Sequence, residues 1–219
     1  MSLSAGWDKY EQARKVITLL KPGSYVNLGI GMPGLVADQM DENLGIYLHC
    51  ENGLIGYRGL YPDEMIDIDV IDAASKPVGL IGGASVVAHD VSFAIARGGR
   101  LDTAVLGAFQ VSEFGDLANW MSPNAVIAGV GGAMDLAVGA KQVIAMMKHV
   151  DKVGEPKIVR SCTYPLTARN VVDYIVSEYA VIAISEEGLI VEELAEGVTE
   201  EFLESVTAAP LKFQVSTSS

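Results

Sequence analysis

Short apolar segments with strand character alternate along this chain with helical segments, and this alternation constrains the fold more than any other feature. Residues 9–20 carry apolar side chains on one helical face, residues 21–23 (KPG) end that helix, and residues 25–28 (YVNL) follow as a strand. Strands that alternate with helices in this way build layered α/β folds around a mostly parallel sheet. We therefore expect an α/β fold with helices packed on its sheet.

The same patterns predict elements along the whole chain. We expect helices from Pro33 to about Glu42 and over residues 85–97, 171–178 and 200–206, the last capped by Thr199. We expect strands at residues 45–50, 66–71, 101–106, 125–130, 180–184 and 189–192, whereas residues 142–147 fit a strand or a helix. No repeat or linker interrupts this order, so residues 1–219 are expected to form a single domain.

Composition excludes several classes of protein. The 219 residues are 50% hydrophobic, which is enough for a sizeable core. A net charge of −13 without a basic face argues against a nucleic-acid partner. No apolar run spans a bilayer and the N-terminus lacks signal-peptide features, so we expect no membrane partner and a cytoplasmic location. Cys50 and Cys162 make no disulfide framework and are interpreted as small buried hydrophobes.

One carboxylate, Glu51, stands at the end of an expected strand in the stretch HCENGLIG, and it supports three interpretations. The first is dinucleotide binding, because Gly29–Gly34 (GIGMPG) matches a G-x-G-x-x-G loop and Glu51 stands about 20 residues later, where a ribose-binding acid would stand. Two features weaken it. The fingerprint usually opens a βαβ unit, whereas here a helix comes before the strand and its loop, and Pro33 removes one amide that would donate to phosphate.

The second interpretation is nucleophilic catalysis, since a carboxylate can attack an activated carbonyl. Asn52-Gly53 tolerates the positive φ of a tight turn that would present Glu51. Gly131 and Gly132 lie in a second glycine cluster, GVGGAMD, whose backbone amides could face developing negative charge. The third interpretation is an ordinary solvated acid at a strand end, the commonest situation, and the residues taken singly leave all three open.

The sequence argues against a cysteine nucleophile and against a metal site. His49 and Cys50 are neighbours on a strand and therefore face opposite sides, so they do not form a base–thiol pair. His49, His89 and His149 are scattered without ligand spacing, so we expect no metal site.

Four blocks taken together are far more specific. NLGIGMP, ENGLIG, SFAIARGGRLDTAVLGAFQVSEFGDLANW and GVGGAMDL closely resemble the B (β) subunit of family I CoA-transferases, the group of 3-oxoacid, 3-oxoadipate and short-chain acyl CoA-transferases. The resemblance runs from about Tyr25 to Val206. It implies an open three-layer α/β/α fold of the isomerase-related CoA-transferase type. It also implies a partner A (α) subunit in a hetero-oligomer, with the site between the two.

The resemblance also implies roles for particular residues. Glu51 matches the catalytic glutamate, which takes CoA from a short-chain acyl-CoA as a glutamyl-CoA thioester and passes it to another carboxylic acid by ping-pong transfer. Coenzyme A is then a substrate, and no permanently bound cofactor is expected. The remaining substrate- or CoA-binding positions are Gly29, Gly31, Asn52, Gly53, Gly131 and Gly132, of which the last two line the thioester and supply an oxyanion donor.

The chain departs from the family pattern in three places. Cys50 replaces a serine, and residues 120–125 (WMSPNA) lack the lysine of the family's WMIPGK block. Residues 86–90 (VVAHD), which include His89, stand where the family usually has aromatic residues. These changes keep open a non-catalytic protein with the same fold. The cations considered for the CoA phosphates are Arg58, Lys76, Arg97, Arg100 and Lys141, with no ranking among them.

Overall fold

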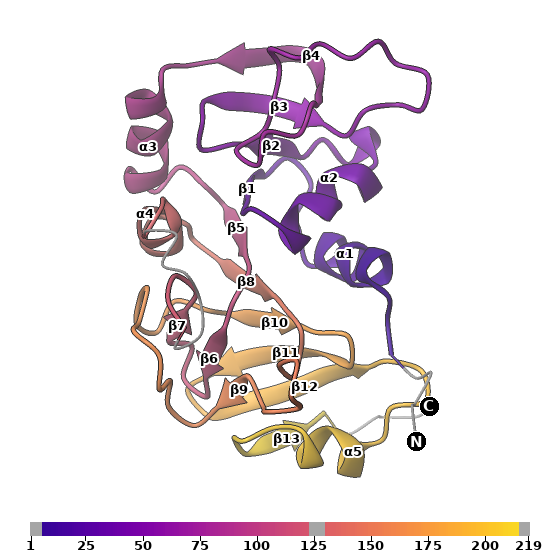
Figure 1. Ribbon diagram of the computed structural model, residues 1–219, viewed down its shortest axis with the longest axis vertical. Coiled ribbons are helices and arrows are strands. Elements are labelled where there is room, and N and C mark those ends of the chain that lie inside the picture. The colour runs from indigo at the N-terminus through magenta and orange to yellow at the C-terminus, as the bar shows by residue number, and fades with distance from the viewer. Residues whose placement is uncertain (1–5, 123–129, 215–219) are drawn as a thin grey trace.

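The computed structural model describes residues 6–122 and 130–214, in which helices and strands alternate (Figure 1). In chain order the elements are α1 (Lys9–Thr18), β1 (Tyr25–Leu28), η1 (Met32–Gly34), α2 (Leu35–Gln39), η2 (Glu42–Leu44), β2 (Tyr47–His49), β3 (Leu54–Arg58), β4 (Gly79–Val86), α3 (His89–Arg97), β5 (Thr103–Leu106), β6 (Gln110–Ser112), β7 (Leu117–Ala118), α4 (Ala133–Gly139), β8 (Val143–Met146), β9 (Ile158–Val159), β10 (Tyr174–Val176), β11 (Ala180–Ser185), β12 (Gly188–Leu194), α5 (Glu200–Ser205) and β13 (Leu211–Phe213). The letter η marks a 3-10 helix.

The main sheet has ten strands in the order β13-β12-β11-β10-β8-β5-β1-β2-β3-β4. Its central strands, from β10 to β2, are all parallel. Antiparallel pairs flank them on both sides, β2-β3-β4 at one end and β10-β11-β12 at the other. At the outer edge, β12 and β13 pair in parallel again. The sheet is therefore mixed, because short connections such as the one between β2 and β3 permit only antiparallel pairing.

Two hydrophobic cores lie on opposite faces of this sheet. On β5, Ala104 and Leu106 belong to one core and Val105 to the other, and β8 divides its side chains in the same alternating way. Helices α1 and α2 cover one face, while α3, α4 and a small sheet of β7, β6 and β9 cover the other (Figure 1). This confirms the α/β class and its layered arrangement.

Local signals account for the helices that were predicted best. Helix α1 begins at a capping box in which Asp8 accepts from the amide of Glu11 at 2.8 Å and the Glu11 carboxylate accepts from the amide of Asp8 at 2.7 Å. Helix α5 begins at Thr199, whose hydroxyl accepts from the amide of Phe202 at 3.2 Å, as expected.

Two expected elements are wrong. Residues 66–71 form turns and one isolated bridge instead of a strand, and Ile66 and Ile68 are 57% and 78% exposed. The residues expected as a helix at 171–178 instead contain β10, whose Tyr174, Ile175 and Val176 pair with β8 and β11. β-Branched and aromatic side chains favour this paired, half-buried setting over a helix.

Other expected elements are present but begin or end at different residues. The helix expected over 85–97 begins only at His89, because residues 85 and 86 end β4. The helix from Pro33 divides into η1 and the short α2, and ends at Gln39. The ambiguous segment 142–147 contains strand β8. The strand expected at 125–130 lies, apart from Val130, outside the described residues.

Both cysteines carry free thiols, and Cys50 is buried among apolar side chains as expected, whereas Cys162 is half-buried. In the part of the chain that the structure describes, no helix has the length and apolar character needed to cross a membrane.

Candidate functional site

The site is built from loops that leave the carboxyl ends of the central parallel strands. Gly29 follows β1, Gly107 follows β5 and Met147 follows β8, while Glu51 stands two residues beyond the end of β2. All four residues line one cavity of about 520 Å³. Ligands of open α/β sheets bind outside this edge, where the diverging loops leave a crevice.

Glu51 is presented by a tight turn between β2 and β3. The amide of Gly53 donates to the carbonyl of Cys50 at 2.9 Å, and the amide of Cys50 donates to the carbonyl of Leu54 at 2.8 Å. Gly53 has a φ of 121°. An added Cβ there would lie 2.1 Å from the carbonyl oxygen of Val87, so only glycine fits this turn.

The carboxylate of Glu51 is half-buried against the start of helix α4. A Cβ added to Gly132 would lie 2.6 Å from Oε2 of Glu51 and 2.7 Å from Cζ of Phe93. Burial raises the pKa of Glu51 above its ordinary value of 4.5, and the charge of His89 acts in the opposite direction. A carboxylate stripped of part of its water is a more reactive anion than a solvated one.

The second glycine cluster lies beside Glu51, where the family resemblance placed it. Gly131 has a φ of 59°, and Gly132 caps the N-terminus of α4. Both glycines line the same cavity as Glu51. Backbone amides that begin a helix are suited to stabilise negative charge, and no side chain among the described residues caps those of α4.

The other predicted site residues lie nearby without lining this cavity. The side chain of Asn52 is turned away, and its Nδ2 donates to the carbonyl of Ile71 at 2.7 Å, which anchors the loop between β3 and β4. Gly31 lines a smaller adjoining cavity of about 150 Å³ together with Gly29. Asn52 and Gly53 therefore belong to the turn that presents Glu51, the setting that their residue types predicted.

The amide of Gly29 is already used, which weakens the dinucleotide interpretation. It donates to the carbonyl of Val105 at 2.8 Å and is not free to bind a pyrophosphate. The helix that follows is the five-residue α2, entered through a 3-10 turn, instead of one long helix aimed at the loop.

The lysines of the site, Lys148 and Lys157, were not expected from the sequence. Four of the cations considered are committed to ion pairs: Arg58 with Glu64, Lys76 with Asp38, Arg97 with Asp135, and Lys141 with Asp102. The cavity is instead lined by Lys148 and Lys157, together with Phe109, Asn119 and Trp120. Burial lowers the pKa of Lys157 to about 8. No local motif marks Lys157, which comes from a loop distant in sequence from Glu51.

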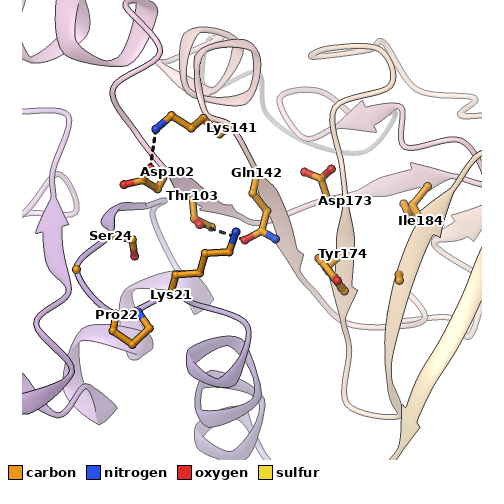
Figure 2. A pocket seen from close by; sticks show the side chains of 12 residues that line it. Lys21, Pro22, Ser24, Asp102, Thr103, Lys141, Gln142, Asp173, Tyr174 and Ile184 are labelled. Atoms are coloured by element: carbon orange, nitrogen blue, oxygen red, sulfur yellow. Dashed lines mark hydrogen bonds and ion pairs between the residues drawn. The ribbon is translucent and has the colours of Figure 1, made fainter.

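A second cavity, of about 510 Å³, lies at the opposite edge of the same strands (Figure 2). Its lining comes from residues directly before the strands, among them Asp102 before β5 and Asp173 before β10. Lys141 pairs with Asp102 at 2.7 Å, and Asp173 accepts from the amide of Val143 at 2.7 Å. Most of its charged groups are already paired with one another or with backbone amides, so we place the chemistry in the cavity that Glu51 lines.

Metal ligation was not expected from the sequence. Within residues 6–122 and 130–214, no group of three or more His, Cys, Asp or Glu side chains is arranged to hold a metal ion.

Comparison with known proteins identifies the family. Residues 10–203 match the family described as Coenzyme A transferase. The B subunit of the 3-oxoadipate CoA-transferase of Pseudomonas putida is 43% identical over 212 residues, which are 96% of this chain and 99% of that protein. The B subunit of the succinyl-CoA:3-ketoacid coenzyme A transferase of Helicobacter pylori is 44% identical over 197 residues, which are 90% and 94% of the two chains. The chain therefore belongs to the coenzyme A transferase family.

Both relatives are B subunits that align along nearly their whole length, so this chain is the B subunit of a CoA-transferase of the 3-oxoacid type. The acyl-CoA transferase YdiF of Escherichia coli O157:H7 shares the fold with a TM-score of 0.75 at 19% identity. The alignment covers 95% of this chain but only 42% of that longer chain. The name of a B subunit implies a partner A subunit, as expected from the resemblance.

Proposed function

We propose that this chain, paired with an A subunit, moves CoA from a short-chain acyl-CoA of the 3-oxoacyl or succinyl type to a second carboxylic acid, with Glu51 as the nucleophile. The observation that carries the proposal is the half-buried Glu51 carboxylate, presented by a glycine turn and packed against Gly132 in a cavity of about 520 Å³. This arrangement presents the carboxylate to the cavity while keeping much of the surrounding water away.

The reaction divides into four balanced attacks. The Glu51 carboxylate attacks the thioester carbonyl of the donor, which releases CoA thiolate and leaves an acyl-glutamyl anhydride. The thiolate attacks the glutamyl carbonyl of this anhydride, so that the donor acid leaves and a glutamyl-CoA thioester remains. The acceptor carboxylate then attacks this thioester, and the thiolate released attacks the acceptor carbonyl of the new anhydride. The new acyl-CoA departs and Glu51 regains its carboxylate.

Each tetrahedral intermediate in this sequence carries a negative oxygen. Gly131 and the start of α4 at Gly132 adjoin Glu51, and backbone amides there would stabilise such an oxygen without needing to rearrange. The glycines also allow the thioester to approach the main chain closely, which a side chain at Gly132 would prevent.

The CoA phosphates need positive charge in a chain whose net charge is −13. Lys157 and Lys148 supply it in the lining of the cavity, although Lys148 also lies 3.6 Å from Glu178. Because burial lowers the pKa of Lys157 to about 8, an arriving phosphate would favour its protonated form and gain a charge-assisted hydrogen bond.

An A subunit is the proposed cover of this cavity. Ile30, Phe109 and Val130 line it and yet are 63%, 37% and 39% exposed. Covering these apolar side chains would be favourable, and it would exclude the water that hydrolyses anhydrides and thioesters. The greater length of the E. coli acyl-CoA transferase is consistent with a second half joined in one chain.

The test is a transferase assay on the assembled complex with Glu51 replaced. Glu51→Ala is expected to abolish transfer while the fold and the pairing with the A subunit remain. Glu51→Asp shortens the reach by one methylene, and a large loss of kcat is expected because reacting atoms must meet within about 3–3.5 Å. Near wild-type activity of either variant would refute the covalent role.

A further inference from the structure

Three buried polar side chains lie beneath the turn that carries Glu51, and none of the four attacks uses them. Asn27 of β1, His49 of β2 and Ser92 of α3 are 1%, 1% and 0% exposed. Buried polar groups cost free energy unless they are hydrogen-bonded, so three of them at one point of an apolar sheet need an explanation.

With the Asn27 amide oriented as in the structure, the hydrogen bonds among them have one consistent direction. Nδ2 of Asn27 donates to the carbonyl of His49 at 3.2 Å and lies 3.0 Å from its Nδ1. An amide nitrogen can only donate, so Nδ1 accepts and the ring proton is on Nε2. Nε2 lies 2.9 Å from Oγ of Ser92, which therefore accepts and turns its own hydrogen toward the carbonyl of Cys50 at 3.3 Å.

The opposite orientation of the Asn27 amide is less favourable. Oδ1 of Asn27 is buried and has no hydrogen-bond partner among the described residues. Exchanging the two amide atoms would bring Oδ1 to the imidazole but would forfeit the bond to the carbonyl of His49. Burial also lowers the pKa of His49 to about 4, which keeps the ring neutral at pH 7.

The chain of hydrogen bonds ends on the peptide bond that joins Cys50 to Glu51. The Cys50 carbonyl accepts from the amide of Gly53 at 2.9 Å as well as from Ser92. A carbonyl has two lone pairs, and here both are occupied. One bond comes from within the turn and the other from helix α3, so Ser92 ties the Glu51 backbone to a separate element.

We propose that Asn27, His49 and Ser92 are positioning residues that hold the Cys50–Glu51 peptide and thereby keep the Glu51 carboxylate within reach of the thioester. The inference rests on the proposed function. None of the three touches the reacting atoms, and His49 acts as a neutral ring protonated on Nε2.

The test compares Ser92→Ala with wild type in the complex with the A subunit. Losing the tie to α3 is expected to lower kcat by about 10- to 100-fold, because a misplacement near 1 Å costs about 100-fold, while KM for the acyl-CoA changes less than about twofold. His49→Gln, whose amide can reach the place of Nε2, should keep most of the activity. His49→Asn cannot reach Ser92 and should lose as much as Ser92→Ala.

Thr207→Val is the matched control. The hydroxyl of Thr207 lies 2.8 Å from Nε2 of the buried His149 and donates to the carbonyl of Leu203 at 2.7 Å, so it copies the bonding of Ser92 away from Glu51. A purely structural role predicts that both variants lose stability and neither loses kcat. The positioning role predicts that only Ser92→Ala loses kcat.

The outcomes separate this inference from the proposed function. A complex of Ser92→Ala with wild-type kcat, in an enzyme whose wild type forms a CoA adduct on Glu51, overturns the positioning role alone. Absence of that adduct in the wild type overturns the function itself. If Ser92→Ala does not assemble with the A subunit, ¹⁵N NMR of the wild-type complex at pH 7 is used instead to determine which ring nitrogen of His49 carries the proton. A proton on Nε2 supports the inference, and a proton on Nδ1 or on both nitrogens overturns it.

Discussion

Gly132→Ala tests the closest contact that the structure gives Glu51. The added Cβ would lie 2.6 Å from Oε2 of Glu51 and 2.7 Å from Cζ of Phe93, whereas ordinary contact begins at 3.4 Å. The distance from the added Cβ to Oε2 of Glu51 is therefore too short by about 0.8 Å, the difference between 3.4 and 2.6 Å. Gly132 has a φ of −87°, so alanine adds no backbone strain and the effect comes from the collision.

The magnitude follows from that displacement. A misplacement of 1 Å costs about 100-fold in rate. Because Glu51, Phe93 and α4 can share the movement, we expect kcat to fall by about 10- to 100-fold, or about 1.4–2.7 kcal/mol in activation free energy. Overpacking is also expected to cost about 1–3 kcal/mol of stability. The assay is steady-state transfer of CoA by the assembled complex, together with its Tm.

Two comparisons sharpen the result. Gly82→Ala makes the same chemical change at a position where the added Cβ would have no atom of the described residues within 4 Å apart from its chain neighbours. It should leave kcat unaltered. With Asp at position 51, the carboxylate is withdrawn from Gly132, so Gly132→Ala should cost much less there than in the wild type. Wild-type kcat in Gly132→Ala, or equal losses in both backgrounds, would show that the contact between position 132 and Glu51 does not limit the reaction.

The other predictions concern the same turn and its carboxylate. Gly53→Ala should destabilise the chain by on the order of 3 kcal/mol, because the residue has a φ of 121° and the new Cβ would lie 2.1 Å from a backbone oxygen of Val87; a Tm within 2 °C of wild type would contradict this. Glu51→Gln should raise the Tm at pH 7, because the raised folded-state pKa of Glu51 means that its ionised form opposes folding. This gain should vanish below the ordinary pKa of 4.5, where Glu51 is protonated in both states, and a Tm equal to that of wild type at every pH would contradict the burial argument. The pH profile of kcat/KM should decline on the acid side around a pKa above 4.5, since protonation removes the nucleophile; an acid limb at or below 4.5 would show that Glu51 is not perturbed in the free enzyme.

The centre of the fold was predictable because its signals are local. The YVNL strand, the glycine loop after it and the turn after Glu51 each follow from neighbouring residues. Parallel pairing then brings the carboxyl ends of the strands together whatever lies between them. Gly131 and Gly132, by contrast, were expected near Glu51 from the family resemblance, since about 80 positions separate them from Glu51 in the chain.

The failures arise where partners distant in sequence decide the outcome. Residues 66–71 alternate as a strand should, but no neighbouring strand among the described residues pairs with them, and Ile68 remains exposed. Residues 174–176 form a strand because β8 and β11 lie on either side, which no local pattern states. The same holds for the site: Lys157 and Ser92 matter through contacts across the fold, so neither was singled out from the sequence.

The most direct test of the central claim is the mass of the chain during turnover. The complex with the A subunit is incubated with acetoacetyl-CoA or succinyl-CoA, quenched in acid, and examined by intact-mass spectrometry and peptide mapping. If Glu51 is the nucleophile, the peptide that holds it gains the mass of CoA less one water, and Glu51→Gln shows no such gain. An active complex that shows no adduct, or an adduct on a different residue, would contradict this role of Glu51.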